Sequence, residues 1–406
     1  MLTKTQQRIL FALHYSLFGG AKPKLNNVDI SALADEAKAQ AVFPFVFTTY
    51  RDELEAVLTP QQFGELDAEY YSAVINGVRV ESEHGELQEI MTAAGIPYVI
   101  MKGCASAMYY PEPALRSMGD VDFLVHESDI PRGIKALEEN GFHRDQYEFT
   151  TNQSAYLRPP MSTWEIHKSP SGIPKGAEGE AIRTELADMI ETAELYVCDS
   201  GSFMVPDKYH HGLILLLHKI SHMTTTGIGL RHLCDWAVFE SSLTNEEFVG
   251  MFEQKLKIFG IWKFAQIMTL VCEKYMGAPK REWAQNPDVE PRLLEDIILD
   301  IFAGGNFGHK DENRQREIKY LTDRKQEKFG ERNIIAQAFS SLNAKVYTNH
   351  RFIDRNRVFL PFGWMIEGGR YVGSLFSGKR KSTGTTAMLK EAAKRKKIYA
   401  NLSLFR

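Results

Sequence analysis

A short apolar segment that carries two aspartates constrains this chain more than any other feature of its sequence. The segment Gly119–Val125 reads GDVDFLV, and Val121–Val125 within it is typical of a buried β-strand. Alternate residues of a strand point to one face, so Asp120 and Asp122 would lie side by side. Buried neighbouring anions repel each other and lose hydration, which makes this pattern unfavourable for packing alone. A divalent cation would remove that cost, and Mg²⁺ prefers carboxylate oxygens.

A second strand candidate, Thr163–His167, supplies a third carboxylate. Alternation places Glu165 and His167 on one face of this strand. If the two segments are neighbours, Asp120, Asp122 and Glu165 would hold two metal ions a few ångströms apart, the arrangement used for phosphoryl or nucleotidyl transfer. The D-x-D motif by itself is also compatible with a calcium site, a capped loop or chance.

The residues before the aspartates would suit a phosphate group. The apolar run Ile96–Met101 predicts a strand, and Lys102 and Gly103 follow it. Gly103 would let the backbone turn sharply, and a helix beginning at Cys104 would aim its N–H groups at phosphate. Lys102 or Arg116 would bring positive charge to a triphosphate. The alternatives are a strand-end lysine at 102 and an arginine that only orders the loop.

The rest of the hydrophobic pattern is mainly helical and predicts an α+β fold. A small mixed β-sheet core is expected, with helical regions on its N-terminal and C-terminal sides. Further strands are expected at Phe142–Phe149 and Ser154–Arg158, and a helix at Ser128–Asn140 with Ser128 as its N-cap. The expected later helices are Pro206–Met223, Leu230–Glu240, several within Asn245–Gly277, Leu293–Phe302, Ala336–Tyr347 and one after Thr386, with a polar connection at Gly304–Lys328.

The same pattern suggests four regions along the 406 residues. They are an N-terminal helical region (1–95), an α/β core (96–200), a helical supporting domain (201–300) and a C-terminal extension with a basic helical tail (301–406).

Composition indicates the cellular compartment in which the protein is expected. The four cysteines are scattered without a C-x-x-C pair, which argues against a disulfide framework or a thiolate zinc site and favours the cytoplasm. No apolar run approaches the roughly 20 residues of a membrane-spanning helix, so no membrane partner is expected. The apolar spacing of Leu2–Leu17 favours an amphipathic first helix over a secretion signal.

Charge is distributed unevenly along the chain. The net charge is −4, but Gly378–Ile398 holds eight basic residues and one acid, Glu391, so that this tail is +7 and the remainder −11. Such a tail either binds a polyanion such as RNA or forms a solvated helix face. The basic residues are Lys379, Arg380, Lys381, Lys390, Lys394, Arg395, Lys396 and Lys397.

The motifs together resemble a known group of enzymes. The region Gly95–Val125, with the readable parts GIPYVIMKG, YYPEPALR and SMGDVDFLV, is similar to the DNA polymerase β-type nucleotidyltransferase superfamily. More specifically, it resembles that superfamily's bacterial "uncharacterised nucleotidyltransferases", whose pattern is roughly K-G, Y-P, R and D-x-D-x-L-V, followed by an E-x-H strand. Trp164–His167 (WEIH) matches the last element, and Gly229–Trp236 (GLRHLCDW) resembles a later helix with Arg and Asp four apart.

The resemblance implies a metal-dependent nucleotidyltransferase. Asp120, Asp122 and Glu165 would be its catalytic and metal-binding carboxylates, with Mg²⁺ or Mn²⁺ as cofactor. An NMP would pass from an NTP such as ATP to a hydroxyl of a small molecule, a protein or RNA, and pyrophosphate would leave. The family often has Gly-Ser or Gly-Gly at the phosphate turn, whereas Cys104 follows Gly103 here. Ser106 is therefore the nearby candidate for a serine contact to phosphate.

Helical residues after the core are candidates for a substrate cleft. His218 and His222 lie four apart on one helix face, and Arg231 and Asp235 on another; His167 joins them from the E-x-H strand. Satisfied helix histidines and an i,i+4 ion pair are the alternative interpretations. For the whole protein, the alternatives are a non-catalytic nucleotide- or partner-binding module of this fold, and a metal-dependent hydrolase that uses the histidine face.

Overall fold

The computed structural model describes residues 1–26, 28–149, 153–310 and 385–405. The chain divides into two units, one of residues 1–310 with 405–406 and one of residues 311–404. In the second unit the described element is α18 (Thr385–Leu402), which confirms the helix predicted after Thr386. The predicted helix Ala336–Tyr347 and the basic residues at 379–381 lie outside the described residues.

The first unit is built on a mixed sheet of five strands in the order β1-β2-β5-β4-β3. The neighbours β2 and β5 are parallel, and the other neighbouring pairs are antiparallel. The sheet and its flanking helices confirm the predicted α+β class. The strands are β1 (Tyr98–Ile100), β2 (Val121–Val125), β3 (His143–Phe149), β4 (Gln153–Leu157) and β5 (Trp164–His167).

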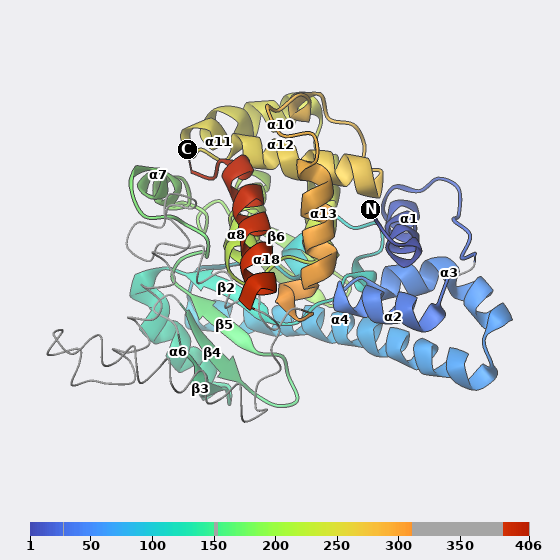
Figure 1. Cartoon of the computed structure of the whole chain (residues 1–406). Coiled ribbons are helices and arrows are strands. Elements are labelled where there is room, and N and C mark those ends of the chain that lie inside the picture. Colours follow the sequence, from blue (N-terminus) through green and yellow to red (C-terminus); the bar gives the residue numbers. More distant parts are fainter. Residues whose placement is uncertain (27, 150–152, 311–384, 406) are drawn as a thin grey trace, which may run out of the picture. The chain divides into compact units, whose positions relative to one another are not determined.

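Four helices precede the sheet, and the last of them is the long helix labelled α4 in Figure 1. It begins with a capping box in which Thr59 accepts from the N–H of Gln62, and it ends at Gly95, whose φ of 62° is left-handed. A Cβ at Gly85 would lie 3.1 Å from the carbonyl oxygen of Ser200, so glycine there allows a hairpin to approach the helix. The helices are α1 (Lys4–Phe18), α2 (Ile30–Ala39), α3 (Phe43–Val57) and α4 (Pro60–Ala94).

Helices α4 and α6 (Ile130–Glu139) cover one face of the sheet. Leu87 and Met91 of α4 and Leu137 of α6 share a buried core with the apolar residues of β2 and β5. Those residues are Val121, Phe123 and Val125 on β2, and Trp164 and Ile166 on β5. Because side chains alternate along a strand, the intervening residues of β2 and β5 point to the opposite face.

The start of α6 differs from the prediction. Its N-cap is Asp129, whose side chain makes no capping hydrogen bond, and Ser128 lies in the preceding 3₁₀ turn η2 (Glu127–Asp129). The prediction of Ser128 as N-cap was therefore wrong, because the 3₁₀ turn places the helix start one residue later. The chain leaves α6 at Gly141, whose φ of 83° suits glycine.

A helix and a two-stranded hairpin, none of them predicted, follow the sheet. They are α7 (Ala177–Glu185), β6 (Glu194–Cys198) and β7 (Gly201–Val205). Strand β7 packs on α4 and β1, and its Phe203 and Val205 enter the core of the sheet. The hairpin thus extends the α/β core.

The remainder of the first unit is helical, as the periodicity predicts. Within the described residues, no helix has both the length and the apolar composition needed to span a bilayer. The elements are α8 (Lys208–Thr225), α9 (Leu230–Ser241), α10 (Asn245–Phe248), η3 (Val249–Glu253), α11 (Gln254–Ile258), α12 (Trp262–Val271), η4 (Cys272–Met276), η5 (Glu282–Ala284), α13 (Leu293–Gly304) and η6 (Asn306–Gly308).

Candidate active site

Strand register brings the predicted carboxylates together. In the parallel pair of β2 and β5, Asp122 lies opposite Glu165 and Leu124 lies opposite His167. These four side chains share the face that points away from the apolar core. A one-residue shift in strand register would move every side chain of the strand to the opposite face of the sheet. Burial of Phe123 and Trp164 in the core therefore fixes the carboxylates on this side.

His167 stands between the two carboxylates. Its Nε2 atom lies 3.0 Å from Oδ1 of Asp122 and 3.2 Å from Oε2 of Glu165. The side chain of Gln153 on β4 donates a 2.8 Å hydrogen bond to the same Glu165 oxygen. Asp122, Glu165 and His167 each offer one ligand atom, and the three atoms lie within 4.8 Å of one another. We refer to these three residues as the triad.

Lys102 supplies a positive charge beside the triad. It follows β1, and its Nζ atom lies 2.9 Å from Oδ2 of Asp122. The backbone N–H of Met101 donates to the carbonyl oxygen of Asp122, which holds the end of β1 next to this aspartate. The lysine therefore contacts one oxygen of Asp122 while His167 contacts the other.

The charges of these groups balance one another. Burial alone would raise the pKa of Asp122, but Lys102 and His167 outweigh it and hold the pKa well below its usual range. Burial also disfavours the charged form of His167, yet its bonds to Asp122 and Glu165 raise the pKa of the imidazole. Burial and the neighbouring Asp122 raise the pKa of Glu165. Lys102 and His167 thus both favour the ionised form of Asp122.

The donor set fits a divalent metal ion. Two carboxylate oxygens and one imidazole nitrogen converge, and all three are common metal ligands in proteins. A bound cation would replace the positive charge that a proton on His167 provides between the two carboxylates.

Asp120 lies directly before β2 and is exposed. Among the described residues, it is not a member of the group that could share one metal ion with Asp122 and Glu165. Its charge nevertheless acts on Arg231, whose pKa it helps to raise against the effect of burial. The D-x-D motif therefore places one aspartate inside the triad and the other at its exposed edge.

The turn after Lys102 has the sharp geometry expected of glycine. Gly103 has φ 62° and ψ −115°, which residues with a side chain rarely adopt. The helix that follows, α5 (Cys104–Ala107), is a single turn, and the N–H groups of Ser106 and Ala107 already bond to the carbonyl of Gly103. The hydroxyl of Ser106 is buried and pairs at 3.3 Å with Nε2 of His211. A phosphate contact by this hydroxyl would require it to leave His211.

Arg116 and Asp235 form a buried ion pair that ties the loop before Asp120 to α9. Nε and Nη2 of Arg116 donate to the two carboxylate oxygens at 2.7 and 2.9 Å, and the hydroxyl of Tyr110 donates at 2.7 Å. Arg231 donates to the carbonyl oxygen of Ser117. The ion-pair partner of Asp235 is thus Arg116 rather than Arg231, four residues away on the helix, and both Arg116 and Arg231 hold the loop.

The two helix histidines lie next to Lys102. Nε2 of His218 is 3.5 Å from Nζ of Lys102 and 2.7 Å from Nε2 of His222. An ammonium group can only donate, so His218 accepts at Nε2 and the proton between the two rings belongs to His222. Burial first, and Lys102 second, lower the pKa of both rings, that of His222 to about 4. Both histidines are therefore neutral near pH 7.

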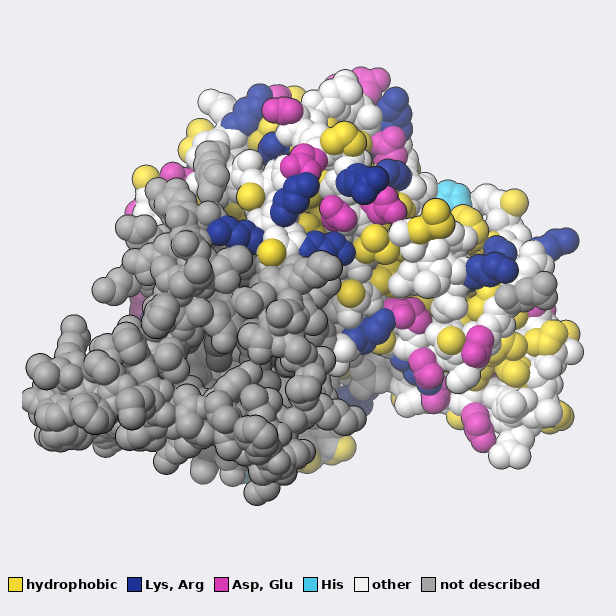
Figure 2. Space-filling model, in the orientation of Figure 1, with side chains coloured by type: hydrophobic (Ala, Val, Ile, Leu, Met, Phe, Trp, Pro, Cys, Tyr) yellow, Lys and Arg dark blue, Asp and Glu magenta, His cyan; other side chains and the backbone are white. Residues whose placement is uncertain are grey.

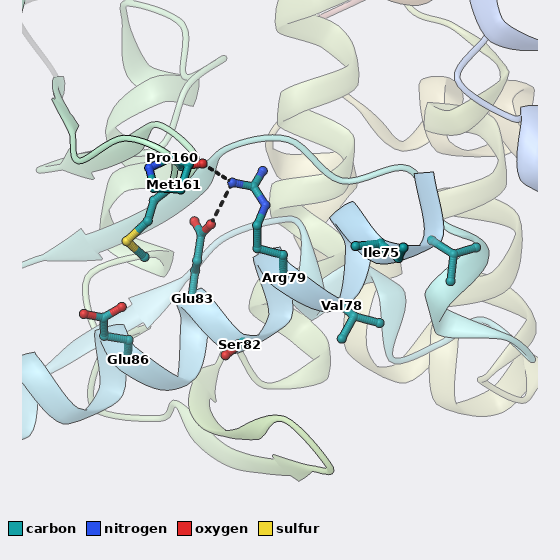
Figure 3. Close-up of a pocket in the computed structure, with 9 residues that line it drawn as sticks. Ile75, Val78, Arg79, Ser82, Glu83, Glu86, Pro160 and Met161 are labelled. Atoms are coloured by element: carbon teal, nitrogen blue, oxygen red, sulfur yellow. Dashed lines mark hydrogen bonds and ion pairs between the residues drawn. The ribbon is translucent and has the colours of Figure 1, made fainter. Parts of the chain in front are cut away.

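A separate pocket of about 590 Å³ opens between α4 and the turn at Pro160 and Met161. Figure 3 shows Arg79 of α4 reaching toward the carbonyl of Pro160 and toward Glu83. The carboxylate of Glu83 also accepts from the N–H of Ser162 and the indole of Trp164, each at 3.1 Å. None of the lining residues belongs to the triad. The polar contacts of this pocket fix the start of β5 from the core side of the sheet.

Two contacts of the site were not predicted. Gln153, which orients Glu165, follows three residues whose structure is not described, and no sequence motif marks it. His167 was predicted only as a residue of the substrate cleft, although the E-x-H spacing places it on the same strand face as Glu165.

Comparison with known proteins supports the class of enzyme. No curated protein matches the chain. The family of uncharacterised nucleotidyltransferases matches residues 26–277, which is more than half of the chain and includes every residue of the triad. The chain therefore belongs to the uncharacterised nucleotidyltransferase family.

Proposed function

We propose that this protein moves a nucleoside monophosphate from an NTP to a hydroxyl group and releases pyrophosphate, in a reaction that depends on divalent metal ions. The observation that carries the proposal is the pairing of Asp122 with Glu165 across two parallel strands, beside Lys102, in a chain of this family. Converging carboxylates of this kind favour a cation as their partner.

Each residue would have a distinct task. Asp122 and Glu165, with Asp120 at the exposed edge, would hold Mg²⁺ or Mn²⁺. Bound there, a pair of ions would neutralise the triphosphate and lower the pKa of the acceptor hydroxyl, as in polymerase β-type enzymes. Glu165 would orient the acceptor hydroxyl or take its proton. Lys102 would offer its ammonium group to the triphosphate, next to Gly103, where the backbone allows a close approach.

The acceptor belongs to one of three classes: a hydroxylated small molecule, a protein side chain or an RNA end. An RNA acceptor would use the basic residues of α18, among them Lys394, Lys396 and Lys397. On the face shown in Figure 2, Lys and Arg side chains of the described residues are interspersed with Asp, Glu and hydrophobic ones. That mixture does not by itself favour RNA over the other classes. A cytoplasmic setting, in which the four free cysteines stay reduced, suits all three.

Transfer of labelled nucleotide tests the proposal. The full chain is incubated with each α-³²P-labelled NTP, Mg²⁺ or Mn²⁺ and a cell extract, after which RNA, protein and small molecules are separated. We expect the label in one class, and its loss in Asp122→Asn. Asp199→Asn, which changes an exposed aspartate in the turn of the hairpin, is the matched control and should retain transfer.

Two results would contradict the proposal. One is the absence of label from all three classes with every NTP and metal ion. The other is full transfer by Asp122→Asn. Metal-dependent NTP binding without any transfer would favour the non-catalytic binding module instead.

A further inference from the structure

The imidazole of His167 lies where a third metal ligand would be expected. Both carboxylates face the same atom, Nε2, and the histidine is almost fully buried at the end of β5. We infer that His167 binds the metal ion together with Asp122 and Glu165, and that this nitrogen ligand makes the site prefer a transition-metal ion such as Mn²⁺ over Mg²⁺. The inference concerns the same site as the proposed function and rests on it only for the biological use of the metal.

The spacing of the ligand atoms supports a shared ion. With metal–ligand bonds of about 2.1 Å, neighbouring ligands in an octahedron or a tetrahedron lie about 3.0–3.4 Å apart. Nε2 of His167 is 3.0 Å from the Asp122 oxygen and 3.2 Å from the Glu165 oxygen. Both separations fall within this range, so the imidazole is spaced from each carboxylate as a second ligand of the same ion would be.

The surrounding contacts hold the ligands in place. Lys102 pairs with Oδ2 of Asp122, which leaves Oδ1 directed at His167. Gln153 donates to the Glu165 oxygen that faces the imidazole and orients it. Such outer contacts orient metal ligands and influence metal affinity. Strand register fixes His167 itself, because it lies opposite Leu124 in the same parallel pair that aligns the carboxylates.

The chemistry of the donor set determines which ion is preferred. Mg²⁺ is a hard ion that takes oxygen ligands in a near-ideal octahedron and keeps several waters. Imidazole nitrogen suits first-row transition ions, and a mixed set of nitrogen and oxygen ligands accommodates Mn²⁺, Co²⁺ and Zn²⁺. A site of three carboxylates would lack this preference. We therefore expect Mn²⁺ to bind at least about tenfold more tightly than Mg²⁺ when no nucleotide is present.

Metal titration of the full chain tests the inference without any activity measurement. The protein is stripped with a chelator and titrated with Mn²⁺ and with Mg²⁺ in the absence of nucleotide, with calorimetry and Mn²⁺ paramagnetic resonance as readouts. His167→Gln should lose about tenfold or more in Mn²⁺ affinity and change little toward Mg²⁺. His167→Asp, which creates a set of three carboxylates, should remove the preference. His143→Gln, at an exposed histidine of β3, is the matched control and should bind as the wild type does.

Metal coordination can also be measured on the wild-type protein, which keeps the inference testable if a variant fails to fold. Electron spin-echo modulation of bound Mn²⁺ detects a directly coordinated ¹⁴N nucleus, and we expect that signal in the wild type. Its absence while Mn²⁺ is bound would overturn the assignment of His167 as a ligand. Equal affinities for Mn²⁺ and Mg²⁺ would overturn the preference, whatever the nitrogen signal shows.

The outcomes separate this inference from the proposed function. Mn²⁺ binding with a nitrogen signal but without nucleotide transfer would uphold the metal site and refute the transfer reaction. Nucleotide transfer with Mg²⁺, together with no preference for Mn²⁺ and no nitrogen signal, would uphold the reaction and refute the role of His167.

Discussion

The Nζ atom of Lys102 lies 2.9 Å from Oδ2 of Asp122, and the other oxygen of this carboxylate faces His167. Asp122 is therefore held ionised by Lys102 at one oxygen and by the imidazole of His167 at the other. The lysine follows the first strand in sequence and the aspartate lies on the second, so an antiparallel strand pair brings the two together.

Removal of this lysine should abolish transfer and leave the fold intact. In Lys102→Met, Asp122 loses its ion-pair partner and the triphosphate loses a cation, so we expect transfer to fall at least about 100-fold. Lys135→Met, at an exposed lysine of α6, should retain wild-type activity. The rate of nucleotide transfer and the thermal midpoint of both variants provide the check. A Lys102→Met protein within twofold of the wild-type rate would exclude a role in the reaction.

His218 should act by positioning Lys102. In His218→Leu the ammonium group keeps Asp122 but loses the imidazole acceptor. We expect the KM for NTP to rise about tenfold, because a hydrogen bond to a charged group contributes about 1.5 kcal/mol. The kcat should change less. His218→Gln, whose amide oxygen can accept from the lysine, should recover most of the affinity. A fall in kcat alone, with unchanged KM, would instead indicate direct participation in the chemical step.

The buried pair of Arg116 and Asp235 should contribute to stability. Asp235→Asn leaves the buried guanidinium without its counter-charge, which typically costs about 3–5 kcal/mol. The double variant Arg116→Met/Asp235→Leu should lose less than the sum of the single changes, since neither charge remains unpaired. Urea unfolding measures all the variants. A loss below about 1 kcal/mol in Asp235→Asn would show that the loop relaxes and hydrates the arginine.

Because of Lys219, the stability of the folded protein should depend on pH in the alkaline range. Burial lowers the pKa of this lysine from 10.5 to about 8. Its ammonium group donates to the carbonyl of Leu215 and lies over the ring of Trp236. Below pH 8 the folded protein carries the buried charge, at a cost of about 3 kcal/mol. Between about pH 8 and 10.5 the folded protein releases a proton that the unfolded chain keeps, so the free energy of unfolding rises with pH.

Replacement of Lys219 tests whether its buried charge destabilises the fold, and by how much. Lys219→Met should raise the free energy of unfolding at pH 7 by about 1–2 kcal/mol, since the contact with Trp236 is lost along with the charge. The difference from the wild type should shrink as the pH rises from 8 to 10. Urea unfolding at pH 7, 8, 9 and 10 provides the measurement. A less stable variant with the same pH slope would mean that the ammonium group is well satisfied where it lies.

The sequence was informative where a pattern is local. The strand Val121–Val125 was predicted with its bounds, because it is a short run of apolar residues, broken by Asp122, that follows Gly119. The pairing of Asp122 with Glu165 depends on two segments 43 residues apart, and only the fold aligns them. The predictions for Ser106 and Arg116 named groups that suit a phosphate, whereas packing against α8 and α9 gives both side chains buried partners. Their roles at a nucleotide therefore stay predictions.

The hairpin of β6 and β7 carries a local signal in the sequence. Its turn, Asp199-Ser200, is followed by Gly201 and lies between two short apolar runs, which is typical of a β-hairpin. The ion pair of Arg116 with Asp235 had no such signal. The spacing of Arg231 and Asp235 suggested a local pair, but the loop before Asp120 brings a second arginine to the same carboxylate.

The position of the transferred label tests the central claim most directly. The full chain, with Mn²⁺ and an acceptor fraction that becomes labelled, is given the same NTP labelled either at the α- or at the γ-phosphate. The account predicts that the α-label joins the acceptor, that the γ-label leaves as pyrophosphate, and that Asp122→Asn and Glu165→Gln lose both events. A γ-label on the acceptor, or unchanged transfer by either variant, would contradict it.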